Sequence, residues 1–393
     1  MKYDFDKIID RRNTDSIKFN PTDRGRPDDV LPFWVADMDF QSPPCVLEAL
    51  TERVRHGIFG YSETGRHYFE VLQNWFSSRF EWEIKPEWLV KTPGIVNAIY
   101  IAVRSQTSPG DSIIINQPVY YPFASAVKHN QRNLVISELL YENNHYSIDF
   151  EDFENKILQH NVKMFIFCNP HNPVGRVWTK DELVRLGEIC LRRGVIVAAD
   201  EIHADFIYPG NKHLVFADLH PSFQDITITF TSPSKTFNLA GLQLAHNFIS
   251  NVEIRAKFQR EFERSGLSQS SAMGIVAAKA AYLYGADWLE ELLQYLNGNL
   301  NFTRRFLNHN LPQIKLVEPE GTYLLWLDCK SLNLSVKELE NFILHQAKLW
   351  LDGGTMFGAG GAGFQRINIA CPQAFLQKAL NNLQEAVSRL SHS

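Results

Sequence analysis

The 393-residue chain has little of what would direct a protein to a membrane, to nucleic acid or to an export pathway. No uninterrupted apolar run approaches the ~20 residues that a membrane-spanning helix needs. The opening segment, MKYDFDKIIDRRNTDS, lacks the apolar core of a secretory signal. The net charge of −5 gives no electrostatic reason for binding nucleic acid or an anionic membrane. We therefore expect a cytoplasmic protein with no nucleic-acid or membrane partner.

Cysteine is also scarce, with five residues and no CxxC spacing. Cys168 and Cys190 lie in apolar contexts, which favours reduced core thiols over disulfides or metal ligands. His203 lies between Asp200 and Asp205, a set with the look of metal ligands, but no HExxH motif or paired-histidine helix accompanies it. The sequence therefore predicts no metal site.

Apolar residues, by contrast, are plentiful: 45% of the chain is hydrophobic, enough for substantial cores in two domains. Between residues 91 and 250, short β-rich runs alternate with helical stretches. This alternation predicts the α/β class, with a mostly parallel sheet covered by helices on both faces. The expected strands are 112–116, 134–138, 163–168, 195–199, 226–231 and 246–250.

The pattern changes after residue 271. A long helical region is expected over 272–309, followed by a smaller α+β unit that contains the segments 321–329 and 365–370. We expect the N-terminal segment to pack on this smaller unit. The predicted domains are a large domain at 46–275 and a discontinuous small domain at 1–45 and 276–393.

The glycines at 358–363 match the G-x-G-x-x-G pattern of dinucleotide sites. Such a site requires a strand before the glycines and a helix after them, whose N-terminus holds the pyrophosphate. Here the glycines lead into FQRINIA, which has the pattern of a strand. We therefore interpret this segment as a mobile active-site loop.

Lys235 is the most informative residue of the chain. It lies in ITITFTSPSKTFNLAGLQ, just past a β-branched run that predicts a buried strand. Partial desolvation at such a place lowers the pKa of an amine and prepares it to form a Schiff base. Most lysines, however, are solvated surface groups.

Two further segments have the same form, a strand followed by polar residues. In MFIFCNPHNPVGRVWT, Asn172 lies in a turn-rich loop, which could simply connect a strand to a helix capped by Thr179. In GVIVAADEIHADF, Asp200 ends a short apolar strand, and open α/β sheets bind ligands at such carboxyl ends. A buried carboxylate needs a cationic partner. The alternative for Asp200 is the N-cap of a helix.

In this order and spacing, Asn-Pro-x-Asn-Pro-x-Gly, Asp-Glu and Ser-x-Ser-Lys resemble the fold-type I pyridoxal-phosphate (PLP) enzymes of the class I/II aminotransferase family, over about residues 33–372. The resemblance implies a large domain with a mostly parallel, seven-stranded type of sheet and a smaller α+β domain. Finer features resemble the branch of cystathionine β-lyase and cystalysin-like carbon–sulfur lyases. These features are LPFWVADMDF (31–40), FGYSE (59–63), PVYYPF (118–123), DEIHAD (200–205), SKTFNLAGLQ (234–243) and FQRINIACP (364–372).

The resemblance implies PLP as the cofactor, held by Lys235 through a Schiff base. Asp200 would pair with the pyridinium nitrogen, and Asn172 would donate to the ring oxygen. Tyr120 would stack on the ring unless it is an ordinary core aromatic. His203 would serve the same ring oxygen, or it would only bridge backbone groups.

The phosphate would be bound at a helix start, with help from hydroxyl groups and from the neighbouring subunit. The groups implied are the backbone amides of Gly94, Ile95 and Val96, the hydroxyls of Ser232 and Ser234, and Tyr61 across a dimer interface. Many aminotransferases carry an arginine about eight residues after the lysine. This chain has Gln243 there, a loss that the lyase branch shares.

Arg366 would clamp the α-carboxylate of the substrate, although a strand arginine is usually a surface group. Main-chain groups around Val35 and Ala36 would complete that carboxylate site. Tyr121 would reach the phosphate or the substrate as a catalytic group, unless it is a core aromatic.

The activity implied is β-elimination from an amino-acid substrate by a homodimer with shared active sites. Cystathionine would yield homocysteine, pyruvate and ammonia, which belongs to amino-acid metabolism and methionine biosynthesis. The first alternative is a transaminase, which for a dicarboxylate substrate would need a second cation, such as Arg66 or Arg104. The second alternative is a regulatory PLP-binding protein. The sequence shows no appended DNA-binding segment that would support it.

Overall fold

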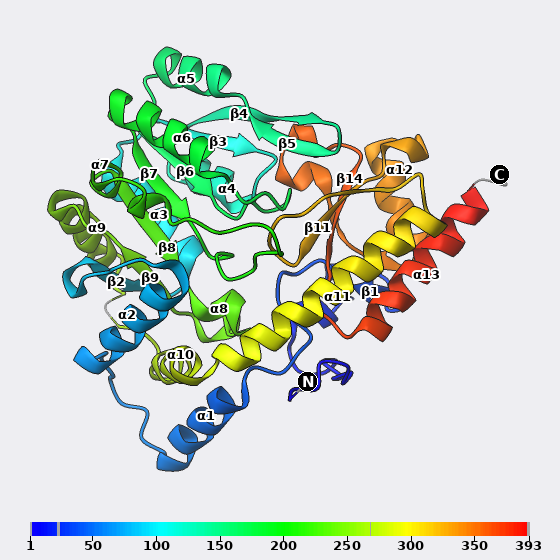
Figure 1. Cartoon of the computed structure of the whole chain (residues 1–393), viewed down its shortest axis with the longest axis horizontal. Helices are drawn as coiled ribbons and strands as arrows, with labels where there is room; N and C mark the ends of the chain where they lie inside the picture. The colour runs from blue at the N-terminus through cyan, green and yellow to red at the C-terminus, as the bar shows by residue number, and fades with distance from the viewer. Residues whose placement is uncertain (1, 22–23, 268, 391–393) are drawn as a thin grey trace.

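The computed structural model describes residues 2–21, 24–267 and 269–390. Its main feature is an eight-stranded sheet with the strand order β2-β9-β8-β7-β6-β3-β4-β5 (Figure 1). The pairs β3–β4, β3–β6, β6–β7 and β7–β8 are parallel. The strands are β2 (Leu89–Thr92), β3 (Ser112–Gln117), β4 (Asn133–Glu142), β5 (His145–Ile148), β6 (Met164–Cys168), β7 (Ile196–Asp200), β8 (Thr227–Thr231) and β9 (Ala245–Phe248).

The prediction of a mostly parallel α/β sheet is confirmed. The resemblance implied a sheet of seven strands, whereas the observed sheet has eight. The extra strand is β5, which pairs antiparallel with β4. Asn143 and Asn144 join the two strands, and both have positive φ values, 49° and 65°. This is the backbone form of a tight hairpin turn, which asparagine tolerates better than most residues.

Helices cover both faces of the sheet, and side chains alternate between two cores. Ile114 of β3 packs in one core with α5 (Phe150–Gln159), α6 (Lys180–Arg193) and α7 (Pro221–Gln224). Its neighbours Ile113 and Ile115 pack in the other core. The helices of that second core are α3 (Ile95–Gln106), α4 (Pro122–His129) and α9 (Val252–Arg264).

A further group of helices lies beside the sheet and continues toward the second unit (Figure 1). The expected helix over 272–309 is in fact two helices, because Gly285 interrupts it and glycine is a poor helix former. The helices of this group are α1 (Pro44–His56), α2 (Arg66–Phe80), α8 (Pro233–Thr236), α10 (Ala272–Tyr284), α11 (Ala286–Asn310) and α13 (Gln373–Leu390).

The smaller unit is built on a four-stranded antiparallel sheet with the order β10-β11-β14-β13. Phe33 of the N-terminal segment stacks on Phe375 of α13, with ring centroids 4.9 Å apart. The N-terminal segment therefore packs on this unit. The division of the chain into a large domain at 46–275 and a small domain formed by the remaining residues stays a proposal. The remaining elements are β1 (Leu31–Pro32), β10 (Lys315–Val317), β11 (Leu324–Asp328), α12 (Val336–Asn341), β12 (Leu349–Trp350), β13 (Asp352–Gly353) and β14 (Phe364–Asn368).

The glycine-rich segment is not a dinucleotide site. It consists of two short 3-10 turns, Gly354–Phe357 and Ala359–Gly361, and leads into β14 as expected. Gly358 has a φ of 130°, and a Cβ there would lie 2.5 Å from Gln117 Oε1. The loop therefore needs this glycine in order to pack against the end of β3.

In the parts of the chain that the structure describes, no helix has the length and apolar character to cross a membrane. All five cysteines are free, and four of them, including Cys168 and Cys190, are buried. The prediction of reduced core thiols at those two positions is confirmed.

Candidate active site

The ends of the parallel strands surround a cavity of about 420 Å³. Asp200, the last residue of β7, lies in register with Cys168 of β6 and Phe230 of β8. The strand ends therefore deliver the predicted residues to one place, as the topology of open α/β sheets requires. The predicted residues that line the cavity are Ala36, Gly94, Ile95, Val96, Tyr120, Asn172, Asp200, His203, Ser232, Ser234 and Lys235.

Lys235 projects from the short helix α8, which begins directly after β8. Ser232 caps this helix, since its hydroxyl oxygen accepts from the Ser234 N–H at 3.1 Å. Lys235 Nζ donates to the Ala36 carbonyl at 2.6 Å. Burial lowers the pKa of Lys235 to about 8, with the positive charge of Arg366 acting in the same direction and the negative charges of Asp37 and Asp200 opposing it. The amine is therefore prepared to react near neutral pH.

Asp200 accepts one hydrogen bond, from the Ile202 N–H at 3.1 Å. Burial raises the pKa of this carboxyl to about 7, against the opposing effect of the Lys235 charge. The helix N-cap interpretation is wrong, because turns rather than a helix follow β7. The carboxyl therefore faces the cavity and can pair with a cationic ligand group.

The Asp200 carboxyl should contribute a loss of stability to the ligand-free protein as the pH rises from 5 to 7.5, measured as the difference between the parent and Asp200→Asn. The raised pKa of Asp200 means that the folded protein binds this proton more tightly than the unfolded chain. Stability of this kind is present below the unfolded pKa and is lost as the pH rises through the folded pKa. The expected loss is ~2 kcal/mol, since a tenfold change in proton affinity is worth about 1.4 kcal/mol.

The lowered pKa of Lys235 acts in a separate window, where stability falls as the pH drops from 10.5 toward about 8. Asp200→Asn should remove the loss between pH 5 and pH 7.5. Urea unfolding of the ligand-free parent and variant at the two pH values measures it. The same pH dependence in both proteins would contradict the assignment.

Arg366 is not a surface group, since only 4% of it is exposed. Its Nη1 donates to Asn172 Oδ1 at 2.9 Å, and its Nη2 donates to the Trp34 carbonyl at 2.8 Å. It also forms an ion pair with Asp352. Arg366 thus reaches the site through Asn172, whose Nδ2 has no partner among the described residues and is free to donate.

Tyr120 and His203 contribute rings to the cavity. The Tyr120 N–H donates to the Asn172 carbonyl at 3.1 Å. The His203 ring stands edge-on to Tyr323, with centroids 5.9 Å apart. Its Nδ1 is buried without a partner, and burial lowers the pKa of His203 to about 3. A neutral imidazole therefore faces the cavity, and the backbone-bridging alternative is wrong for the described chain.

At the far end of the cavity, α3 begins after Gly94, whose φ is 98°. The Ser232 hydroxyl is already used, since it donates to the Leu244 carbonyl at 2.7 Å. Ser234 has no side-chain partner among the described residues. Gln243 also lines the cavity. The helix start, Ser234 and Gln243 are therefore the groups available to an anion at this end.

Three of the predicted site residues do not line the cavity. Arg366 contacts it through Asn172, whereas the other two are exposed tyrosines. Tyr61 is 94% exposed in the loop between α1 and α2, and Tyr121 is 45% exposed just before α4. A single chain does not bring either residue into contact with Lys235. The role implied for Tyr61 depends on a second chain, and the roles of both tyrosines stay predictions.

Sequence reasoning missed two residues of the site. The Tyr323 hydroxyl donates to the Ala36 carbonyl at 3.0 Å, beside Lys235 Nζ. Asp352 holds the Arg366 guanidinium. Both lie on or next to strands of the smaller sheet, and no local motif marks them.

The residues present fit the PLP that the resemblance implies. A reactive amine, a buried carboxyl with one hydrogen bond and an aromatic ring line one cavity, and a helix N-terminus closes its far end. PLP presents an aldehyde, a ring nitrogen, a flat ring and a phosphate, which match these groups in turn. Among the described residues, no cluster of three or more His, Cys, Asp or Glu side chains could hold a metal ion.

A sheet that places a desolvated lysine and a buried carboxylate at neighbouring strand ends defines a class of enzymes that work on amines through a carbonyl cofactor. Within that class, the family model named "Aminotransferase class I and II" matches residues 28–383. The chain belongs to the class I and II aminotransferase family. The sequence-based assignments of family and fold are confirmed.

The similar proteins point to one branch of the family. The chain is 43% identical over 385 residues to "Cystathionine beta-lyase PatB" of Bacillus subtilis, covering 98% of this chain and all of that protein. The structure of cystalysin from Treponema denticola, described as containing a pyridoxal 5'-phosphate cofactor, is 38% identical with a TM-score of 0.96, over 99% of this chain and 100% of that chain. The PLP-bound C–S lyase from Staphylococcus hominis is 34% identical with a TM-score of 0.92, over 98% of each chain.

Proposed function

We propose that this protein is a PLP-dependent carbon–sulfur β-lyase. It cleaves cystathionine or related S-substituted cysteines to a thiol, pyruvate and ammonia. The observation that carries the proposal is full-length similarity to a cystathionine β-lyase, on a site whose lysine, carboxylate and arginine are in place. Cystathionine would release homocysteine, which places the reaction in methionine biosynthesis. Five free cysteines agree with a reducing, cytoplasmic setting.

Each residue of the cavity has a proposed role. When bound, PLP supplies an electron sink for the carbanion formed at the α-carbon. Lys235 binds the cofactor aldehyde and, once displaced by the substrate, takes up the α-proton. Asp200 keeps the ring nitrogen protonated, and Asn172 Nδ2 donates to the ring oxygen. Tyr120 covers one face of the ring.

The substrate α-carboxylate is assigned to Arg366, which Asp352 and Asn172 hold in place. The Ala36 N–H donates to no acceptor among the described residues, so it can complete this carboxylate site. Its carbonyl is already occupied by Lys235. One arginine clamp is sufficient for a thioether substrate, whose sulfur leaves as a thiolate.

The arginines that a dicarboxylate transaminase could have used lie elsewhere. Arg66 is exposed and pairs with Glu70, at 3.2 Å on the same helix. Arg104 pairs with Glu261 at 2.6 Å. In the described chain, neither lines the cavity, and neither contacts a residue that lines it as Arg366 contacts Asn172. The absence of a second cation from the described cavity lining favours elimination over transamination of a dicarboxylate.

A substrate panel tests the activity. Cystathionine, cysteine and cystine are supplied to the PLP-loaded protein, and both pyruvate and free thiol are measured. We expect pyruvate from one or more of these substrates, with thiol released from cystathionine in equal amount. A protein that forms neither product from any of the three is not a C–S lyase.

The working unit is proposed to be a homodimer with shared active sites. Ile58, Phe59 and Tyr61 are exposed together in the loop between α1 and α2, and Val54 is exposed on α1. Such a group of exposed apolar side chains is typical of a surface that another chain covers. Tyr61 would then reach the phosphate in the partner's site, and Tyr121 would face the same shared space.

Hybrid dimers test the shared site. Lys235→Ala and Tyr61→Ala should each be nearly inactive alone. In a hybrid, one site contains both mutations and the other contains neither. Random mixing should therefore restore about a quarter of the parent activity, since about half of the dimers are hybrids with one intact site. A fully active monomer in sedimentation, or no recovery after verified subunit exchange, would contradict the proposal.

A further inference from the structure

The segment 33–40, which we call the strap, connects the lysine and the arginine of the site. The Trp34 carbonyl accepts a hydrogen bond from Arg366 Nη2 at 2.8 Å. The Ala36 carbonyl accepts from Lys235 Nζ at 2.6 Å. Two peptide groups of one short segment therefore hold both functional cations, and a displaced strap would move both acceptors together.

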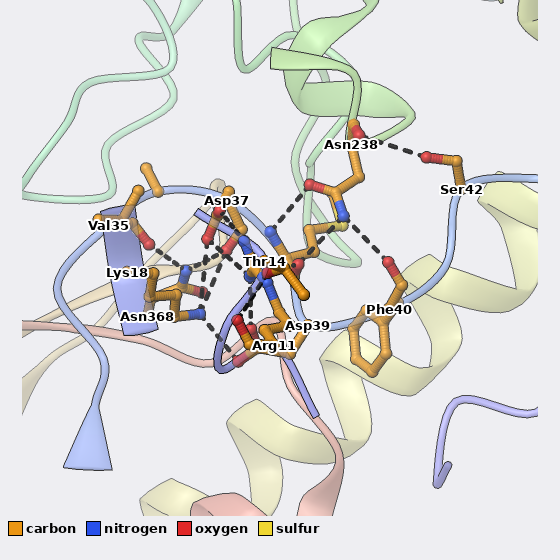
Figure 2. A network of polar contacts seen from close by, with 12 residues as sticks. Arg11, Thr14, Lys18, Val35, Asp37, Asp39, Phe40, Ser42, Asn238 and Asn368 are labelled. Carbon is orange, nitrogen blue, oxygen red and sulfur yellow. Dashed lines mark hydrogen bonds and ion pairs between the residues drawn. The ribbon is translucent and has the colours of Figure 1, made fainter. Parts of the chain in front are cut away.

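Asn368 fixes the strap on the arginine side. It lies on β14, two residues after Arg366. Its Nδ2 donates to the Val35 and Asp37 carbonyls, both at 2.6 Å (Figure 2). The Ala36 peptide thus lies between two carbonyls that one side chain holds.

Asn238 fixes the strap on the lysine side, three residues after Lys235. Its Nδ2 donates to the Met38 and Phe40 carbonyls at 3.0 and 2.9 Å, and its Oδ1 accepts from the Met38 N–H at 3.0 Å (Figure 2). Its φ is 57°, a backbone form that asparagine tolerates better than most residues. Three backbone groups of the strap therefore depend on this one side chain.

Four charged side chains anchor the strap to the N-terminal segment (Figure 2). Asp39 accepts from Arg11 at 2.7 Å and from Lys18 at 2.8 Å. Asp37 pairs with Arg11 at 2.5 Å. Lys18 is 1% exposed and Asp39 6% exposed. We call this cluster of four side chains the anchor. Its two negative and two positive charges cancel, so it can be buried without net charge.

The lysine amine needs such a fixed acceptor. A buried amine without a hydrogen-bond acceptor is costly. Among the described residues, the Ala36 carbonyl is the acceptor that Lys235 Nζ contacts within hydrogen-bond distance. In the ligand-free chain, the position of this carbonyl therefore fixes the position of the amine.

We propose that Asn238 and the anchor are positioning residues for the reaction, because they hold the Ala36 carbonyl where it orients the freed Lys235 amine for proton transfer. They act through the strap and lie outside the residues that line the cavity. The proposal rests on the role assigned above to Lys235. It assigns a catalytic consequence to side chains that otherwise serve only to fold the N-terminal segment.

The test compares Asn238→Ala with a matched control, Asn251→Ala. Asn251 also contacts three backbone groups, but at the start of α9. Its Oδ1 accepts from the Glu253 and Ile254 N–H groups, and its Nδ2 donates to the Asp225 carbonyl. Both substitutions remove three backbone contacts of a partly buried asparagine, and only Asn238 touches the strap.

Two measurements separate positioning from stability. In the PLP-free protein, acetylation of Lys235 by acetic anhydride, quantified on the peptide that contains it, should become several-fold faster in Asn238→Ala than in the parent. In the loaded enzyme, kcat for cystathionine should fall by roughly 10- to 100-fold, the scale of a small misplacement of a reacting group. KM should change far less, because Asn368 still holds the strap beside Arg366. Asn251→Ala should change neither quantity.

Equal labelling and equal kcat in the two variants, with similar losses of thermal stability, would overturn the proposal. If Asn238→Ala does not fold, Asp39→Asn takes its place. Its control is Glu261→Gln, which breaks the remote pair with Arg104. Failure of the proposed lyase activity has a different signature: the protein would release no thiol from cystathionine, while the labelling comparison on the PLP-free protein would still be decisive.

Discussion

Replacing Lys235 by alanine is expected to lower the turnover of cystathionine by at least about a thousandfold. The lysine supplies both the covalent attachment of the cofactor and the group that takes up the α-proton. Neither the Ala36 carbonyl nor the Tyr323 hydroxyl, which share its surroundings, can replace an amine. Steady-state kcat of the PLP-loaded variant measures the loss.

Lys156→Ala is the control, since this lysine pairs with Asp152 at 2.8 Å on α5. It should leave turnover within about twofold of the parent, as surface substitutions usually do. Reduction of the parent protein with borohydride should fix PLP on the peptide that contains Lys235. A label on another lysine, or a Lys235→Ala protein with near-normal turnover, would remove the basis of the assignment.

Asp200→Asn is expected to lower kcat by about 10²- to 10³-fold while much of the PLP remains bound. The amide is nearly the same shape, but it cannot balance the positive charge of a protonated ring nitrogen. The charge therefore has no partner when electrons move into the ring. Turnover and the PLP content of the purified variant give the two measurements.

Asp205→Asn is the control that separates a specific fall in kcat, as expected for Asp200→Asn, from a general loss of stability. Asp205 is also buried and belongs to the same turn region, but it pairs with Arg79 at 2.5 Å and accepts from Thr236 at 2.6 Å. It lines no part of the cavity. The control should therefore lower stability more than turnover. Equal losses of kcat in the two variants would contradict a specific role for Asp200.

Sequence patterns predicted the part of the site that local structure places. Asp200 ends β7 and Lys235 lies shortly after β8, and the parallel pairing of these two strands brings their ends together. The resemblance added Arg366 and Asn172, whose contact joins residues far apart in the sequence.

Other features depend on packing that no local pattern records. Tyr323 and Asp352 meet the site because the smaller sheet folds against the strap. The eighth strand depends on an Asn-Asn turn, whose signal is weaker than that of a glycine-containing turn. The role implied for Tyr61 involves a second chain, and the roles of Tyr61 and Tyr121 stay predictions.

The most direct measurement supplies cystathionine as the sole substrate, with no keto acid, and counts the products formed per active site. A lyase regenerates its PLP form in every cycle. We therefore expect many turnovers, with pyruvate, ammonia and homocysteine in equal amounts. If the reaction instead stops after about one turnover, leaves the cofactor as pyridoxamine phosphate, and resumes only when a keto acid is added, the protein is a transaminase and the central claim is wrong.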